Sequence, residues 1–167
     1  TQKGISLFDE QEYSECFDIF KSIIQKNPKH YDANLWLGKT YVAQKNYYNA
    51  KSQFERCLEI DPSNIEPLTE RKEMNYEQKN WRDYVADMEK LKLRNEYTFS
   101  ANDYLSCGYA YAEIYNNVEA LKNYNLAINY NPKMDAAYNN RGIIYSSNGN
   151  KSQALSDYTT AIKYASK

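Results

Sequence analysis

Side chains that could perform acid–base or nucleophilic chemistry are sparse in this 167-residue chain. His30 is the only histidine, and a Ser–His–Asp or Cys–His arrangement would depend on this one residue, which falls in a predicted turn. No glycine-rich loop precedes a predicted helix, so the sequence contains neither a P-loop nor a dinucleotide-binding motif. We therefore expect no catalytic residues, no cofactor and no enzymatic activity.

The three cysteines also lack the spacing of a chemical site. Cys16, Cys57 and Cys107 are odd in number and widely separated, which matches neither a paired disulfide framework nor the CxxC spacing of zinc ligands. We interpret them as small buried apolar residues and predict no metal site. Because free thiols persist in a reducing compartment, a cytoplasmic location is expected.

Four glutamates fall on one face of a predicted helix. Glu66, Glu70, Glu73 and Glu77 are spaced three or four residues apart, which places them side by side on a helical surface. A solvated face that keeps the protein soluble is one interpretation. A surface that binds a basic ligand is the other.

The overall charge excludes two classes of partner. The chain has 21 Lys and Arg against 22 Asp and Glu, which gives a formal net charge of −1. A nucleic-acid backbone or an anionic membrane surface requires a basic patch, so neither is an expected partner. The longest uncharged stretch runs only from Asn123 to Pro132, far short of the roughly 20 apolar residues of a membrane span. We expect no membrane insertion.

The sequence contains an internal repeat. One set of residues recurs with identical internal spacing further along the chain, as Gly38, Tyr41, Ala50, Phe54, Pro62 and as Gly108, Tyr111, Ala120, Tyr124, Pro132. Much of the same spacing appears near both ends, as Gly4, Leu7, Cys16, Phe20, Pro28 and as Gly142, Tyr145, Ala154, Tyr158. These residues resemble the tetratricopeptide repeat, which has a period of about 34 residues.

The resemblance implies an all-α fold, an α-solenoid in which about five helix pairs form a right-handed superhelix. We expect one continuous array over residues 1–167, with units at 1–30, 31–64, 65–100, 101–134 and 135–167, the first truncated at its N-terminus. Helices are predicted over residues 31–44, 47–60, 102–114 and 118–130. Gly and Ala at the packing positions let paired helices approach closely, and the aromatic residues fill the space between units.

The third unit departs from this pattern. It has Lys72 and Tyr84 where its neighbours have Gly and Ala, and two extra residues precede the fourth unit within 95–100. Two large side chains cannot both fit between closely packed helices. We expect this helix pair to be splayed, with the Lys72 side chain extending outward.

The first helix of each unit has a face that the packing positions leave free. In tetratricopeptide proteins these positions line a concave groove, and here they make up a partner-binding surface of Leu35, Trp36, Lys39, Glu66, Glu70, Glu73, Tyr76, Glu77, Asn102, Leu105, Tyr109, Glu113, Asn139 and Asn140. Trp36 stands out as an aromatic anchor. Alternatively, it packs against a neighbouring unit or the truncated first helix.

The groove residues indicate the chemistry of a partner. Trp36, Tyr76 and Tyr109 beside the four glutamates suit a peptide or helix that has apolar anchors and Lys or Arg. The carboxylate clamp of chaperone-binding family members is absent, since the corresponding residues from the second unit onward are Leu35, Lys39, Glu70, Asn102 and Ser106.

Three functional hypotheses remain, and one of them is a targeting or regulatory domain attached to a catalytic domain. The other two are more specific. The first is a non-catalytic scaffold that binds a peptide or helix of a partner protein in the groove. The alternative is an architectural segment of a longer helical array, or a domain that forms homo-oligomers through its open ends, because free-standing arrays normally have polar capping repeats.

Overall fold

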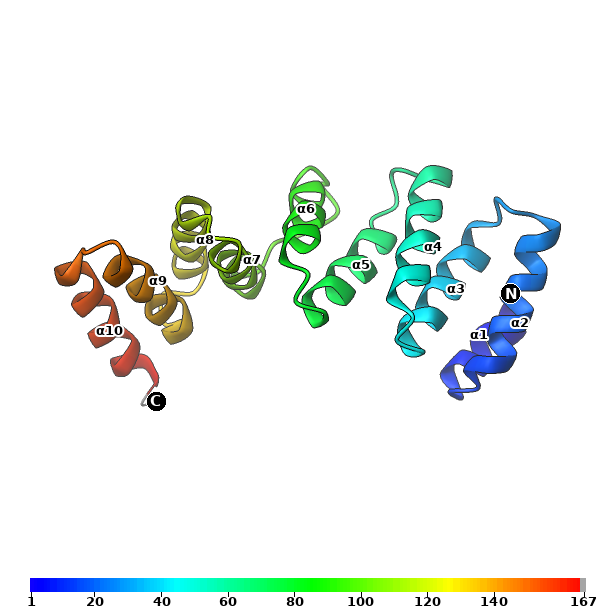
Figure 1. The fold of residues 1–167 in the computed structure, drawn as a ribbon, viewed down its shortest axis with the longest axis horizontal. Helices are drawn as coiled ribbons and strands as arrows, with labels where there is room; N and C mark the ends of the chain where they lie inside the picture. Colours follow the sequence, from blue (N-terminus) through cyan, green and yellow to red (C-terminus); the bar gives the residue numbers. More distant parts are fainter. Residues whose placement is uncertain (166–167) are drawn as a thin grey trace. The chain divides into compact units, whose positions relative to one another are not determined.

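Ten α-helices and no strand make up residues 1–165, the part of the chain that the computed structural model describes (Figure 1). Their bounds are α1 Gln2–Asp9, α2 Tyr13–Lys26, α3 Tyr31–Ala43, α4 Tyr47–Ile60, α5 Glu66–Glu77, α6 Trp81–Lys92, α7 Ala101–Glu113, α8 Asn117–Tyr130, α9 Asp135–Ser147 and α10 Lys151–Ala165. The predicted all-α helical-repeat fold is confirmed. The four helices predicted by range agree with α3, α4, α7 and α8 to within one residue at each end.

The chain divides into two compact units, Thr1–Lys79 and Asn80–Lys167. In the first, α5 packs on α3 and α4; in the second, α6 packs on α7. The boundary therefore falls between the two helices of the third predicted repeat, the repeat whose packing positions depart from the pattern. A single continuous array over all five repeats stays a prediction.

A glycine and an aromatic ring sixteen residues later hold each regular repeat together. A Cβ atom added to Gly108 would lie 2.5 Å from Tyr124 Cε1, and one added to Gly38 would lie 2.6 Å from Phe54 Cε1. Gly4 with Phe20 and Gly142 with Tyr158 repeat the arrangement. Only a residue without a side chain allows the ring to lie this close to the first helix, which explains why the spacing recurs.

The third repeat has Lys72 in place of this glycine. The expectation that Lys72 extends outward is wrong, because its side chain is buried. The ammonium lies 3.2 Å from Oε1 of the exposed Glu73 carboxylate. A lysine can bury its methylene stem while its charged end pairs near the surface.

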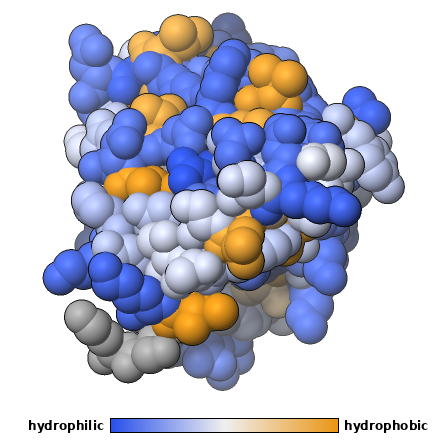
Figure 2. Space-filling view, turned by 90° about the vertical axis from the view of Figure 1, so that its left-hand side faces the viewer, coloured by the Kyte–Doolittle hydropathy of each residue, from blue (hydrophilic) through white to orange (hydrophobic). Residues whose placement is uncertain are grey.

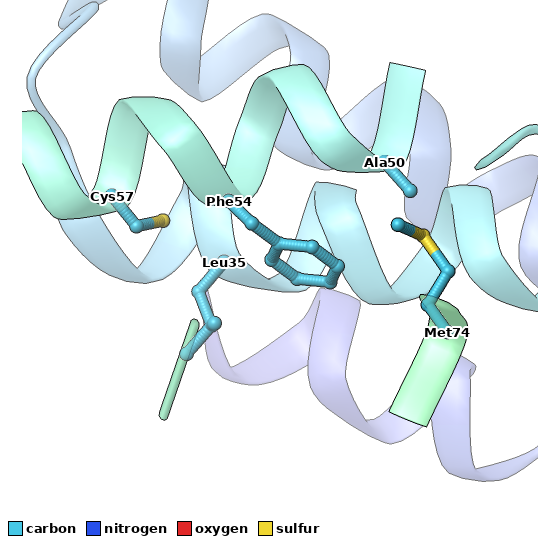
Figure 3. Packing of buried hydrophobic residues seen from close by; sticks show 5 residues of the cluster. All are labelled: Leu35, Ala50, Phe54, Cys57 and Met74. Carbon is cyan, nitrogen blue, oxygen red and sulfur yellow. The ribbon is translucent and has the colours of Figure 1, made fainter. Parts of the chain in front are cut away.

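One core cluster shows how a following helix completes a repeat. Figure 3 shows the Phe54 ring at the centre, with Leu35 and Cys57 on one side and Ala50 and Met74 on the other. Met74 comes from α5, so the second repeat buries its apolar face against the next helix. All three cysteines are buried thiols, which confirms that they are small buried residues.

Candidate functional site

Trp36 lies at the centre of the candidate surface in the first unit. It is partly buried, because its ring meets Phe8 of α1 edge-on at 5.3 Å between ring centroids and stacks on Phe20 at 6.5 Å. The truncated first helix therefore does contact Trp36, as one of the two interpretations expected. The indole also lines an open pocket, and its role as an anchor for a partner stays a prediction.

Lys39 lies one turn after Trp36 on α3 and forms ion pairs with two glutamates of α5. Its Nζ atom is 2.8 Å from Glu66 Oε1, 3.0 Å from Glu70 Oε1 and 4.7 Å from the centre of the Trp36 ring. Burial lowers the pKa of Lys39, but its hydrogen bonds to Glu66 and Glu70 and the charges of both carboxylates outweigh this effect, so the pKa is raised overall. The ammonium is therefore held in its charged form.

An open pocket of about 320 Å³ lies beside this cluster, lined by Phe8, Trp36, Lys39, Val42, Ala43 and Glu70. Four of these side chains are apolar and two are charged. Phe8 is absent from the predicted site, although it stands one repeat before Val42 and therefore occupies the same helical face. The repeat register, extended into the truncated first unit, would have identified it.

Leu35 does not belong to this surface. It is only 4% exposed and packs in the core with Ala50, Phe54 and Met74. The expectation that it lines the groove is wrong, because α4 and α5 cover this side of α3.

The acidic face on α5 is partly neutralised within the chain. Glu66 and Glu70 pair with Lys39, and Glu73 pairs with Lys72. Glu77 and Tyr76 are exposed near the end of α5. The predicted acidic residues therefore divide into a partly exposed pair bound to Lys39 and a more exposed set that follows it.

The second unit carries a smaller pocket of about 140 Å³. Its lining is Tyr109, Ala112, Glu113, Tyr124, Asn140, Ile143 and Ile144. Tyr109 is fixed from the side by Trp81, whose ring meets it edge-on at 5.3 Å between centroids. Burial raises the pKa of the Tyr124 hydroxyl, and the neighbouring Asn140 side chain partly offsets this effect.

Three of the six predicted site residues in this unit thus come together at this pocket. These three are Tyr109, Glu113 and Asn140. Asn102 and Asn139 are exposed and Leu105 is half-buried, and none of the three lines the pocket.

His30, the one histidine of the sequence, has a structural role. His30 caps the N-terminus of α3, since its Nδ1 accepts a hydrogen bond from the Ala33 backbone N–H at 3.3 Å. Within residues 1–165, no three His, Cys, Asp or Glu side chains are grouped so that they could hold a metal ion. None of the helices described for residues 1–165 is long and apolar enough to cross a membrane.

Comparison with known proteins agrees with the repeat pattern. The family model for the tetratricopeptide repeat matches residues 31–64 and 135–167, the limits of the second and fifth predicted units. Over 55 residues the chain is 36% identical to the peroxisomal targeting signal receptors of Komagataella phaffii and Komagataella pastoris. That match covers 33% of this chain and 10% of either receptor, so the chain spans about a tenth of the length of these relatives.

Two solved structures have the same fold at low sequence identity. MamA is 18% identical, with a TM-score of 0.76 over 98% of this chain and 94% of MamA. YrrB, described as a TPR protein with an unusual peptide-binding site, is 19% identical, with a TM-score of 0.78 over 96% of this chain and 82% of YrrB.

Proposed function

Because the chain is a tetratricopeptide repeat protein, we propose that it is a non-catalytic scaffold that binds a peptide or helix of a partner protein on the face formed by its first helices. Tetratricopeptide domains in general serve protein–protein interaction. The observation that carries the proposal is the open pocket at Trp36. A large aromatic side chain that is already held in place by its neighbours loses little entropy on binding and makes an effective anchor.

The chemistry around this pocket favours one kind of ligand. An apolar side chain of the partner fits against Phe8, Trp36 and Val42. Lys or Arg further along the partner would meet Glu73 and Glu77, which are exposed on α5. The proposed ligand is thus a basic peptide or helix with apolar anchors, and the pocket at Tyr109 offers the second unit a similar anchor point.

A chaperone-type carboxylate clamp is not part of the proposal. Such a clamp needs free Lys, Arg and Asn side chains at the groove, whereas the ammonium of Lys39 is already bound by two carboxylates. The names of the relatives support peptide recognition more broadly, since YrrB has a peptide-binding site and the Komagataella proteins are targeting signal receptors.

Selection of peptides from a random display library on the immobilised protein tests this function. We expect enrichment of sequences that combine a large apolar residue with Lys or Arg. In fluorescence anisotropy, Trp36→Ala should weaken the selected peptides about 30-fold, since truncating an anchor of this kind costs about 2 kcal/mol.

Tyr48→Ala is the matched control, because Tyr48 is an exposed aromatic residue on α4, away from the first helices. It should leave affinity unchanged. Enrichment of acidic peptides, or equal losses for both variants, would contradict the proposed site.

A second candidate function, extension of the array, is favoured by the outer face of α10. Leu155 and Ile162 are 67% and 69% exposed. One repeat earlier, the equivalent Leu121 and Ile128 on α8 are half-buried, and α9 packs on that helix. Figure 2 shows hydrophobic patches at this end of the molecule, among hydrophilic residues. In this function, α10 would receive the first helix of a further repeat.

Sedimentation over a range of protein concentrations separates the two functions. If α10 mediates self-association, the protein forms oligomers at high concentration, and Leu155→Glu with Ile162→Glu returns it to a monomer. The control introduces two glutamates at other exposed apolar positions, Tyr48 and Val118, and should leave the oligomer intact. A monomer at every concentration would remove self-association from consideration.

A further inference from the structure

Trp36, Glu66 and Glu70 together have the composition of a cation-binding site. An aromatic face attracts a cation electrostatically, and two carboxylates supply strong, charge-assisted acceptors. In this chain the cation is already present, because the ammonium of Lys39 lies within 4.7 Å of the ring centre and within 3.0 Å of both carboxylates.

We infer that Lys39 fills a cation subsite made by Trp36, Glu66 and Glu70, and thereby restricts the adjoining pocket to uncharged apolar side chains of a partner. This inference rests on the proposed function for its biological meaning. It makes Lys39 a specificity-determining residue of the site.

The Lys39 ammonium contacts all three groups of the subsite. The Lys39 ammonium donates a hydrogen bond to Glu66 at 2.8 Å and forms an ion pair with Glu70 at 3.0 Å, and it also lies over the indole. The Lys39 side chain is 17% exposed, and the Glu66 and Glu70 side chains are 45% and 35% exposed, so the ion pair is partly shielded from solvent. Replacement of this intramolecular cation by a solvent ion is therefore unfavourable.

The same arrangement decides what the neighbouring pocket accepts. Lys39 and Glu70 form its charged wall, and Phe8, Trp36, Val42 and Ala43 provide the rest of its lining. A basic side chain of a partner would lie beside the Lys39 ammonium, with the nearest carboxylates already engaged, and like charges oppose its entry. An apolar side chain meets no such penalty and buries apolar surface.

A partner's basic residues are consequently directed to another part of α5. Glu73 is more exposed than Glu66 or Glu70, and Glu77 lies a turn further along the helix. The surface thus separates an apolar anchor near Trp36 from charge recognition near the end of α5.

Chemical rescue tests this inference: Lys39 is truncated, and a small amine is added to replace the deleted part of its side chain. Lys39→Ala deletes three carbons and the ammonium, which n-propylammonium supplies. In a Trp81→Phe background, Trp36 is the only tryptophan, because the chain has two. We expect saturable binding of n-propylammonium to the Lys39→Ala protein, measured by Trp36 fluorescence, at least tenfold tighter than to the protein that retains Lys39.

Two controls identify the source of this binding. The uncharged n-propanol and sodium chloride at equal ionic strength should have no comparable effect, and Glu66→Gln with Glu70→Gln should abolish the response of the Lys39→Ala protein. Equal binding by the protein with and without Lys39, or an equal effect of n-propanol, would overturn the inference. Lys39→Met provides a second variant that preserves the apolar packing of the stem; it should show weaker uptake than Lys39→Ala, because its side chain still fills the space.

Peptide selection on the same variants separates this inference from the proposed function. Lys39→Ala should shift the selected anchor residue from apolar to Lys or Arg, whereas the original protein should not select a basic anchor. If neither protein selects any peptide, the proposed function fails while the n-propylammonium result still reports on the subsite. If peptides are selected and the anchor does not change, the role of Lys39 in specificity is wrong.

Discussion

Replacing Arg141 with methionine is expected to lower the free energy of unfolding by about 3 kcal/mol. Arg141 donates from Nε to Asp157 Oδ2 at 2.8 Å and from Nη2 to Asp157 Oδ1 at 2.7 Å, a two-bonded pair between α9 and α10. The Asp157 side chain is only 7% exposed. Without the guanidinium, its carboxylate is left buried without its cation, which is the costly outcome.

The guanidinium of Arg141 also connects to a third helix and to two rings. Its Nη1 donates to Asn125 Oδ1 of α8 at 2.6 Å, and its central carbon lies 5.4 Å from the Tyr138 ring centre and 5.9 Å from that of Tyr145. These contacts fix the side chain in the geometry that the two-bonded pair requires. The single substitution should therefore affect packing among α8, α9 and α10 together.

Urea unfolding followed by circular dichroism measures this effect, and a double substitution provides the control. Arg141→Met combined with Asp157→Leu removes both charges, so most of the lost stability should return. If the double variant is as unstable as Arg141→Met alone, the cost arises from lost packing and the explanation by buried charge is wrong.

The second large effect is expected for Gly108→Ala, which should lower the free energy of unfolding by about 2 kcal/mol. The new Cβ would lie 2.5 and 2.6 Å from Cε1 and Cδ1 of Tyr124 and 3.1 Å from its Cγ. The Tyr124 ring is almost fully buried, so it has little room to retreat. Alanine is more favourable in a helix than glycine by about 1 kcal/mol. We expect the steric conflict with Tyr124 to exceed this gain.

Two comparisons isolate the steric cause in the same unfolding measurement. Gly149→Ala introduces no contact within 4 Å, and its cost of about 1 kcal/mol would come from the backbone alone, at φ +79°. Tyr124→Leu in the Gly108→Ala background should reduce the penalty of the glycine substitution, since the atoms that conflict are removed. A penalty that does not depend on residue 124 would contradict this account.

Much of the fold could be predicted from the chain because each repeat encodes its own local packing. The spacing of Gly38 and Phe54, repeated at Gly108 and Tyr124, specifies where a ring of one helix meets the backbone of its partner. The two residues of each pair are close together along the chain, so their spacing can be recognised without knowledge of the neighbouring repeats. Lys72 was predicted wrongly because the burial of a long side chain depends on what surrounds it.

The candidate site was predicted less completely, for a related reason. A helical face gives the direction of a side chain, and this correctly brought Trp36, Lys39 and Glu70 to one pocket. The direction alone does not indicate whether another helix packs over the side chain. Leu35 is buried because α4 and α5 pack over it. The predicted acidic face likewise took no account of Lys39, which belongs to a different repeat from Glu66.

The amino-acid sequence by itself determined the repeat period, the helices and the small residues at the packing positions, because these depend on residues that are close together along the chain. Tertiary structure alone decided that Lys39 reaches Glu66 and Glu70, that Phe8 joins Trp36, and that the compact units divide after Lys79. These features arise where helices from different repeats meet. The burial and charge of each side chain there depend on the helices that pack around it.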